Sequence, residues 1–185
     1  NTIRALSKPD LLNGLSRECA CIYFLDLLRT LRFNARLVAS LTTFSRTKSK
    51  NTKRLAETMY PIDFFVDVLI DDEWITIDVL SGSIGEVTIK DPLYVIAIAN
   101  IPLPPFVTIK DITRKFTDKW SVVVKKRAED WWKQTLWLFS PDREAIGPQE
   151  LKENKALIEM EASEKMPTTL GGFKNHPLFV LERHL

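Results

Sequence analysis

The sequence predicts an α+β fold in which one helix precedes an antiparallel sheet and further helices follow it. Apolar residues recur at helical spacing between residues 17 and 32. Apolar and polar residues then alternate from Ile62 to Ile70, as in a strand with one apolar face. A second helical pattern begins near Ala128. A helix, then consecutive strands, then helices is the order expected of α+β proteins.

The first helix is expected from about Arg17 to Arg32. Residues 33–41 are predicted to form a strand, and a polar, basic loop extends from there to about Tyr60. The apolar face of the helix consists of Ala20, Cys21, Phe24, Leu27, Leu28 and Leu31.

The alternating stretch 62–70 is predicted to form a hairpin with a returning strand at 74–80. Asp71 and Asp72 lie between the two strands, and aspartates favour tight turns. Further strands are expected at 94–99, at 106–113 and near Trp120 to Lys125.

The last third of the chain is predicted to be helical. The apolar stripe of its first helix consists of Ala128, Trp131, Trp132, Thr135, Leu136 and Phe139. For the three tryptophans, Trp131, Trp132 and Trp137, helical spacing favours packing in the core over stacking on bases. Beyond this helix we expect a charged helix at 148–164, a break at Met166-Pro167 and Gly171-Gly172, and a short helix from about His176-Pro177.

Composition excludes several classes of protein. No stretch approaches the roughly 20 apolar residues of a membrane-spanning helix, and no membrane association is expected. The only cysteines are Cys19 and Cys21, too few for a disulfide framework and without further ligands for zinc. They are expected to be buried structural thiols, and no metal or cofactor is predicted. The two chain ends suggest a piece of a longer protein.

The net charge is only +2, but basic residues are concentrated in the stretches 46–54 and 110–127. Acidic residues are concentrated at 63–73 and 142–164. Such segregation fits a nucleic-acid-binding surface, and it equally fits solvated loops and helix faces.

A helix followed by Phe33-Asn34-Ala35-Arg36 resembles the peptide N-glycanase branch of the papain-like and transglutaminase-like fold. The resemblance implies a core with a central helix packed on an antiparallel sheet. Enzymes with this core use a cysteine at the start of the helix, a histidine and an acid. These three positions fall at Arg17, Asp63 and Asp78, so only the acid remains. The resemblance therefore implies an inactive site, in which we expect Asp78 to form a structural hydrogen bond, with Arg17 as its partner.

Several blocks along the chain resemble the xeroderma pigmentosum group C (XPC) family of DNA-damage recognition proteins, fungal counterparts included. They are the helix and strand at 27–38, the stretches 74–82 and 94–97, residues 110–116, the double tryptophan at 127–132, and the long C-terminal block, Met166-Pro167 with 173–185. The resemblance implies a catalytically inactive transglutaminase-like domain at 1–165 and the start of the first β-hairpin domain at 166–185. It also implies a nuclear role in nucleotide excision repair. The expected partners are double-stranded DNA, held on the undamaged flank of a lesion, and an adaptor protein with a ubiquitin-like domain.

The candidate DNA-binding residues form two groups. The first is Lys125, Lys126 and Arg127, and the second is Lys174, Asn175, His176, Arg183 and His184. For the second group, capping of a helix and packing of the domain junction is an equally good interpretation. Two other functions remain open: an active cysteine amidase of the peptide N-glycanase type, and a scaffold that binds only the adaptor.

Overall fold

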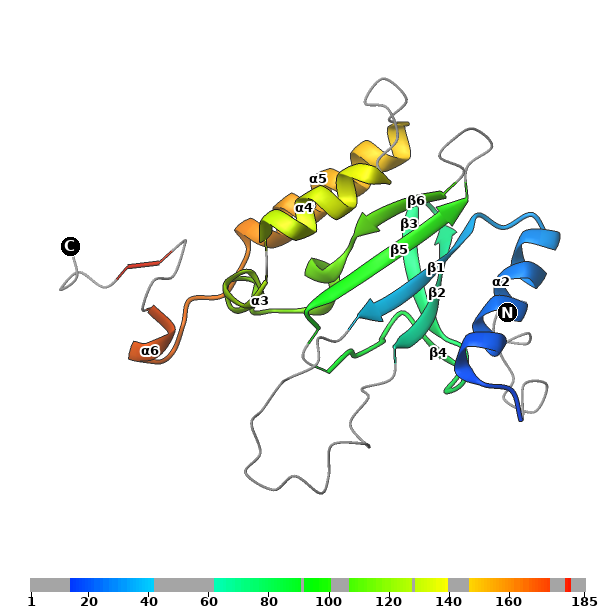
Figure 1. The fold of residues 1–185 in the computed structure, drawn as a ribbon, viewed down its shortest axis with the longest axis horizontal. Helices are drawn as coiled ribbons and strands as arrows, with labels where there is room; N and C mark the ends of the chain where they lie inside the picture. Colours follow the sequence, from blue (N-terminus) through cyan, green and yellow to red (C-terminus); the bar gives the residue numbers. More distant parts are fainter. Residues whose placement is uncertain are drawn as a thin grey trace.

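The chain forms a six-stranded antiparallel sheet with helices packed on both of its faces (Figure 1). The structure, a computed structural model, describes residues 14–41, 62–90, 92–100, 107–127, 129–139, 147–173 and 179–180. The strands are β1 (Ala35–Leu41), β2 (Asp63–Ile70), β3 (Glu73–Asp78), β4 (Ser83–Ile84), β5 (Tyr94–Asn100) and β6 (Val107–Asp111). Their order across the sheet is β4-β3-β2-β1-β5-β6, and every neighbouring pair is antiparallel. The predicted α+β class is confirmed.

The helices lie before and after the strands in the chain. In Figure 1, α2 lies to the right of the sheet, α4 and α5 lie along its upper left side, and α6 lies further to the left. In chain order they are α2 (Arg17–Thr30), the 3-10 helix η2 (Thr113–Phe116), α3 (Trp120–Lys126), α4 (Glu129–Leu138), α5 (Pro148–Ala162) and α6 (Leu170–Phe173). Within these described elements, no helix is long and apolar enough to cross a membrane.

Strands β2 and β3 form the predicted hairpin. Ile70 pairs with Glu73, which leaves Asp71 and Asp72 as the two residues of the turn. Both have positive φ angles, 48° and 66°. Two-residue turns with positive φ at both positions match the twist of the strands they connect, and aspartate tolerates this conformation better than most residues.

Helix α2 begins where its sequence predicts and packs its apolar face on the sheet. The Ser16 side chain accepts a hydrogen bond from the Cys19 amide at 3.3 Å and so caps the first turn. Phe24 and Leu28 are almost completely buried, in a cluster with residues of β2 and β3 such as Val66. Burying each of these two large side chains contributes about 1.5–3 kcal/mol.

Side chains on alternate residues of the strands reach opposite faces of the sheet, and different elements cover each face. One face packs against α2 and, at its other end, against Trp132 and Leu136 of α4. The other face holds a second apolar cluster that includes Val38, Phe65 and Ile112, with Leu157 of α5 packed against it.

The expected strand near Trp120 to Lys125 is wrong, because this stretch is the helix α3. Three consecutive valines give it strand propensity. The tertiary context decides otherwise: both amide and hydroxyl of Ser121, in the first turn of the helix, donate to the carboxylate of Glu164. A carboxylate at a helix N-terminus satisfies amides that have no partner within the helix and interacts favourably with the helix dipole.

The predicted break is confirmed at Met166-Pro167, which lies between α5 and α6. It is wrong at Gly171-Gly172, since both glycines lie within the short helix α6. The helix expected from about His176-Pro177 lies outside the described residues.

Candidate functional site

The three triad positions inferred from the sequence meet at one place in the structure. Arg17 is the first residue of α2, Asp63 the first of β2, and Asp78 the last of β3. Nη1 of Arg17 donates to Oδ1 of Asp78 at 3.1 Å, and its Nε lies 3.7 Å from Oδ1 of Asp63. The predicted hydrogen bond between Arg17 and Asp78 is confirmed.

The two carboxylates explain how an arginine is held at the start of a helix. A cation at this end is unfavourable, because the helix dipole is positive there. Asp78 and Asp63 offset that cost, and Asp78 also accepts hydrogen bonds from the backbone amides of Leu80 and Ser81. The group therefore orders the start of α2 and the turn after β3, and it contains neither a thiol nor an imidazole.

The two cysteines lie in different environments. Cys21 is fully buried, and its Sγ donates to the carbonyl oxygen of Phe64 at 3.3 Å. Burial raises the pKa of the Cys21 thiol to about 12, so the thiolate is not populated at neutral pH. Cys19 is exposed, which corrects the expectation of two buried thiols. Among the described residues, no cluster of three histidine, cysteine or acidic side chains could hold a metal ion.

The first group of candidate DNA-binding residues contains two exposed side chains and one buried side chain. Lys125 and Lys126 are exposed on the last turn of α3. Arg127 is only 9% exposed, and its guanidinium makes its contacts inside the protein. The prediction that Arg127 contacts DNA is therefore corrected: this side chain has an architectural role.

Arg127 is at the centre of a polar and aromatic cluster between α3 and α4. It donates to Asp111 at 2.7 Å, to the hydroxyl of Thr113 at 2.7 Å and to the carbonyl of Leu93 at 2.8 Å. Trp132 Nε1 donates to the same Asp111 oxygen at 2.7 Å. The rings surrounding the guanidinium are those of Tyr94, Trp120 and Trp132.

The tryptophans of α4 differ in environment. Trp132 is 3% exposed, which confirms core packing for this residue. Trp131 and Trp137 are 56% and 75% exposed, so the core interpretation is wrong for these two. The ring of Trp131 contacts Tyr94 edge-on, at 6.1 Å between centroids, and its outer surface faces solvent.

The second group of candidate DNA-binding residues lies outside the described residues. It comprises Lys174, Asn175, His176, Arg183 and His184.

Sequence reasoning missed a buried ionic cluster on the face of the sheet opposite α2. Arg36 donates to Asp67 at 2.9 Å and to Glu153 of α5 at 2.5 Å, and its guanidinium stacks on Trp74 at 3.9 Å. The side chains of Arg36 and Asp67 are 5% and 0% exposed. Lys110 forms a further ion pair with Glu153 at 2.9 Å. The one signal in the sequence was Asp67 itself, a charged residue in the middle of a buried strand.

The ionic cluster shifts the pKa values of its members in opposite directions. Burial alone would raise the pKa of Glu153, but the hydrogen bonds and charge interactions with Arg36 and Lys110 together outweigh burial and lower it. Burial opposes the charge of Arg36, yet Glu153 and Asp67 together raise its pKa. Glu153 and Arg36 are therefore both charged at neutral pH, and their pairing attaches α5 to the sheet.

Comparison with known proteins finds similarity to DNA repair factors. A family model described as Rad4 beta-hairpin domain 1 matches residues 163–185. The Drosophila melanogaster homologue of the DNA repair protein complementing XP-C cells is 30% identical over 132 residues, which are 66% of this chain and 10% of that protein. The chain is similar to proteins of the XPC family. The DNA repair protein rhp41 of Schizosaccharomyces pombe, also similar, is 32% identical over 83 residues, which are 42% of this chain and 13% of that protein.

Solved structures show that this chain shares the fold of part of Rad4 over most of its own length. A Rad4–Rad23 complex bound to a 6-4 photoproduct UV lesion matches with a TM-score of 0.67, covering 91% of this chain and 38% of that chain. A Rad4–Rad23 complex crosslinked to an undamaged DNA matches with a TM-score of 0.69, covering 90% of this chain and 38% of that chain. Both are 24% identical in sequence. The chain spans only about a tenth of the length of its curated relatives.

Proposed function

We propose that this chain is the DNA- and partner-binding module of a nucleotide excision repair factor, and that it holds duplex DNA beside a lesion. The observation that carries the proposal is its relation, at 30% and 32% identity, to two proteins named for DNA repair. The shared fold supports it, because matching complexes contain either a UV lesion or undamaged DNA. A module that binds both kinds of site would contact phosphates, which position a protein without specifying sequence.

Two further parts of the proposal concern partners and location. Rad23 is present in both matching complexes, so we infer an adaptor of the Rad23 kind, carrying a ubiquitin-like domain, as the protein partner. A repair factor acts on chromosomal DNA, and we accordingly infer a nuclear location.

The core is inferred to be a transglutaminase-like fold that has lost its chemistry. Support comes from the meeting of Arg17, Asp63 and Asp78 at the start of the central helix, where an active relative would need a thiolate and a base. The high pKa of Cys21 and the absence of any described histidine near this group argue against an amidase. The transglutaminase-like domain is proposed to end near residue 165, where the first β-hairpin domain begins.

The exposed lysines at the end of α3 are the proposed phosphate contacts among the described residues. Lys125 and Lys126 lie on the last turn of this helix. Lys174, Asn175, His176, Arg183 and His184 remain proposed contacts from the part of the chain matched by the hairpin-domain family.

The decisive experiment is a titration of undamaged duplex at several salt concentrations. Replacing Lys125 and Lys126 together by Gln should reduce the slope of log K against log salt by about 0.9 for each phosphate that is no longer neutralised, for all duplex sequences alike. The matched control replaces Lys152 and Lys155, two exposed lysines of α5, by Gln. Both variants remove two positive charges, so a decrease confined to the first assigns the phosphate-binding surface to α3.

Two results would contradict parts of the proposal. An unchanged slope in the Lys125 and Lys126 variant would place DNA elsewhere on the chain. Failure of the unaltered chain to bind any duplex, while it still binds a Rad23-like adaptor, would favour a pure interaction scaffold.

A further inference from the structure

The segment that leaves α5 is fastened to the sheet domain by a buried carboxylate. Glu164 lies two residues after the end of α5 and is 7% exposed. Its Oε1 and Oε2 accept hydrogen bonds from the Ser121 amide at 3.2 and 3.1 Å, and Oε1 also accepts one from the Ser121 hydroxyl at 2.9 Å. Glu164 thus caps the N-terminus of α3, from 43 residues further along the chain.

A second contact joins the same two segments, with the side chain now contributed by η2 and the backbone acceptor by α5. Arg114 of η2 is 8% exposed, and its guanidinium donates to the carbonyl oxygens of Met160 and Thr117. Met160 lies in the last turn of α5, where carbonyl groups have no partner within the helix. A cation there is also favoured by the negative end of the helix dipole.

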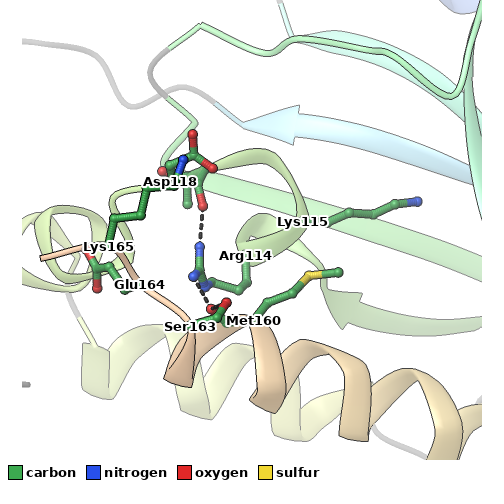
Figure 2. Close-up of a pocket in the computed structure, with 8 residues that line it drawn as sticks. Arg114, Lys115, Asp118, Met160, Ser163, Glu164 and Lys165 are labelled. Atoms are coloured by element: carbon green, nitrogen blue, oxygen red, sulfur yellow. Dashed lines mark hydrogen bonds between the residues drawn. The ribbon is translucent and has the colours of Figure 1, made fainter.

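These two contacts enclose a shared pocket between the end of α5 and the segment that connects η2 to α3 (Figure 2). The pocket has a volume of about 220 Å³, and Arg114, Thr117, Met160, Ser163 and Glu164 are among the residues that line it. The match to the hairpin-domain family begins at residue 163, inside this junction.

We infer that Arg114 and Glu164 are positioning residues that fix the direction in which the chain leaves the sheet domain and enters the hairpin domain. The inference rests on the proposed function, because the direction matters only if both parts hold one duplex. The structural reason is that each of the two segments caps a helix of the other. The acid after α5 caps α3, and the base before α3 caps α5, so the exit segment is held at two points and cannot rotate about either one alone.

The test measures the direction itself and needs no DNA. Cys19 is exposed and Cys21 is fully buried, so a spin label attaches at Cys19, and a second is placed at Leu170→Cys on exposed α6. The distance between the labels should be narrowly distributed in the otherwise unaltered chain. Glu164→Ala and Arg114→Lys should each lose the single narrow distance and give a broad distribution.

Matched controls separate positioning from general damage. Glu159→Ala removes an exposed acid of α5. Arg29→Lys alters an arginine of α2 that donates to the carbonyl oxygen of Ala35. Both should keep the narrow distance. Hydrogen exchange of the Ser121 amide should become roughly tenfold faster or more in Glu164→Ala, whereas strands β1 and β2 remain protected.

The inference is overturned if the junction variants keep the narrow distance of the unaltered chain. If Glu164→Ala unfolds the sheet domain, Arg114→Lys takes its place, and a distribution as narrow as that of the unaltered chain overturns the inference equally. Duplex binding is measured in parallel. Loss of the narrow distance in a chain that binds no duplex refutes the proposed function and leaves the junction contact established.

Discussion

Arg17 and Asp78, 61 residues apart in the chain, form a hydrogen-bonded ion pair at 3.1 Å that joins the start of α2 to the end of β3. The pair is partly exposed, with 31% and 18% of the two side chains accessible. The ion pair orders the first turn of α2 and the last residue of β3, which would otherwise fray.

A double-mutant cycle with Arg17→Ala and Asp78→Ala should give a coupling of about 0.5–1 kcal/mol, as for other partly exposed ion pairs. Asp78→Ala alone should cost more than Arg17→Ala, because the amides of Leu80 and Ser81 also lose their acceptor. Urea unfolding of the four proteins measures these values. Equal costs for the single variants with zero coupling would contradict the structural role.

The chain should not hydrolyse a glycopeptide or an acyl amide. The arginine at position 17 is not a nucleophile. The Cys21 thiol, with a pKa of about 12, is protonated at neutral pH. Product release is measured at high protein concentration, with Cys19→Ser as the matched variant. Turnover that disappears in Cys19→Ser would contradict this prediction and show that the exposed Cys19 thiol acts as a nucleophile.

The free energy of unfolding should decrease at acidic pH because Glu153 becomes protonated. The pKa of its carboxyl is below the ordinary value of 4.5 in the folded protein, so the unfolded chain takes up the proton first. The stabilisation is therefore complete above about pH 4.5 and is lost as pH falls through the lower, folded pKa. Glu153→Gln should cost about 2 kcal/mol at neutral pH and should flatten this part of the pH profile. Glu159→Gln, at an exposed position, should keep the profile of the unaltered chain.

Arg127→Ala should destabilise the domain by about 3 kcal/mol, because it removes a buried guanidinium and leaves the partly buried carboxylate of Asp111 without its cation. Lys126→Ala should change stability by less than about 0.5 kcal/mol, as expected for an exposed lysine. Thermal unfolding separates the two. Equal melting temperatures for the two variants would mean that Arg127 does not hold α3 and α4 together.

The paired tryptophans of α4 should differ in the same measurement. Trp132→Ala should cost about 3–5 kcal/mol, because the ring is buried and its Nε1 donates to Asp111. Trp131→Ala should cost about 1 kcal/mol, since more than half of the side chain is exposed. A larger loss for Trp131 than for Trp132 would contradict the observed packing of α4.

The sequence predicted those elements whose pattern is local. Helix α2 and the β2–β3 hairpin followed from apolar spacing and from the two aspartates of the turn. The meeting of Arg17, Asp63 and Asp78 also followed, because the fold resemblance supplied the long-range pairing that spacing alone cannot give.

The remaining features depend on contacts between distant residues. Three valines in α3 indicated a strand, and the carboxylate that stabilises the helix comes from Glu164. Arg127 lies next to two exposed lysines in the sequence, and only the packing of β6 and α4 shows that its charge is directed inward. The partner of Arg36 in α5 is 117 residues away, beyond any periodic signal.

The edges of the sheet determine how another protein can attach to this domain. At one edge, β4 has only two residues, Ser83–Ile84, too few to template an added strand. At the other edge, the outward amide of Ile109 in β6 already donates to the carbonyl of Phe139, at the end of α4. Extension of the sheet by a strand from another chain is therefore hindered at both ends, which lowers the risk of edge-to-edge aggregation. On the helical surfaces, by contrast, side chains and not backbone pairing would determine the specificity of a partner protein.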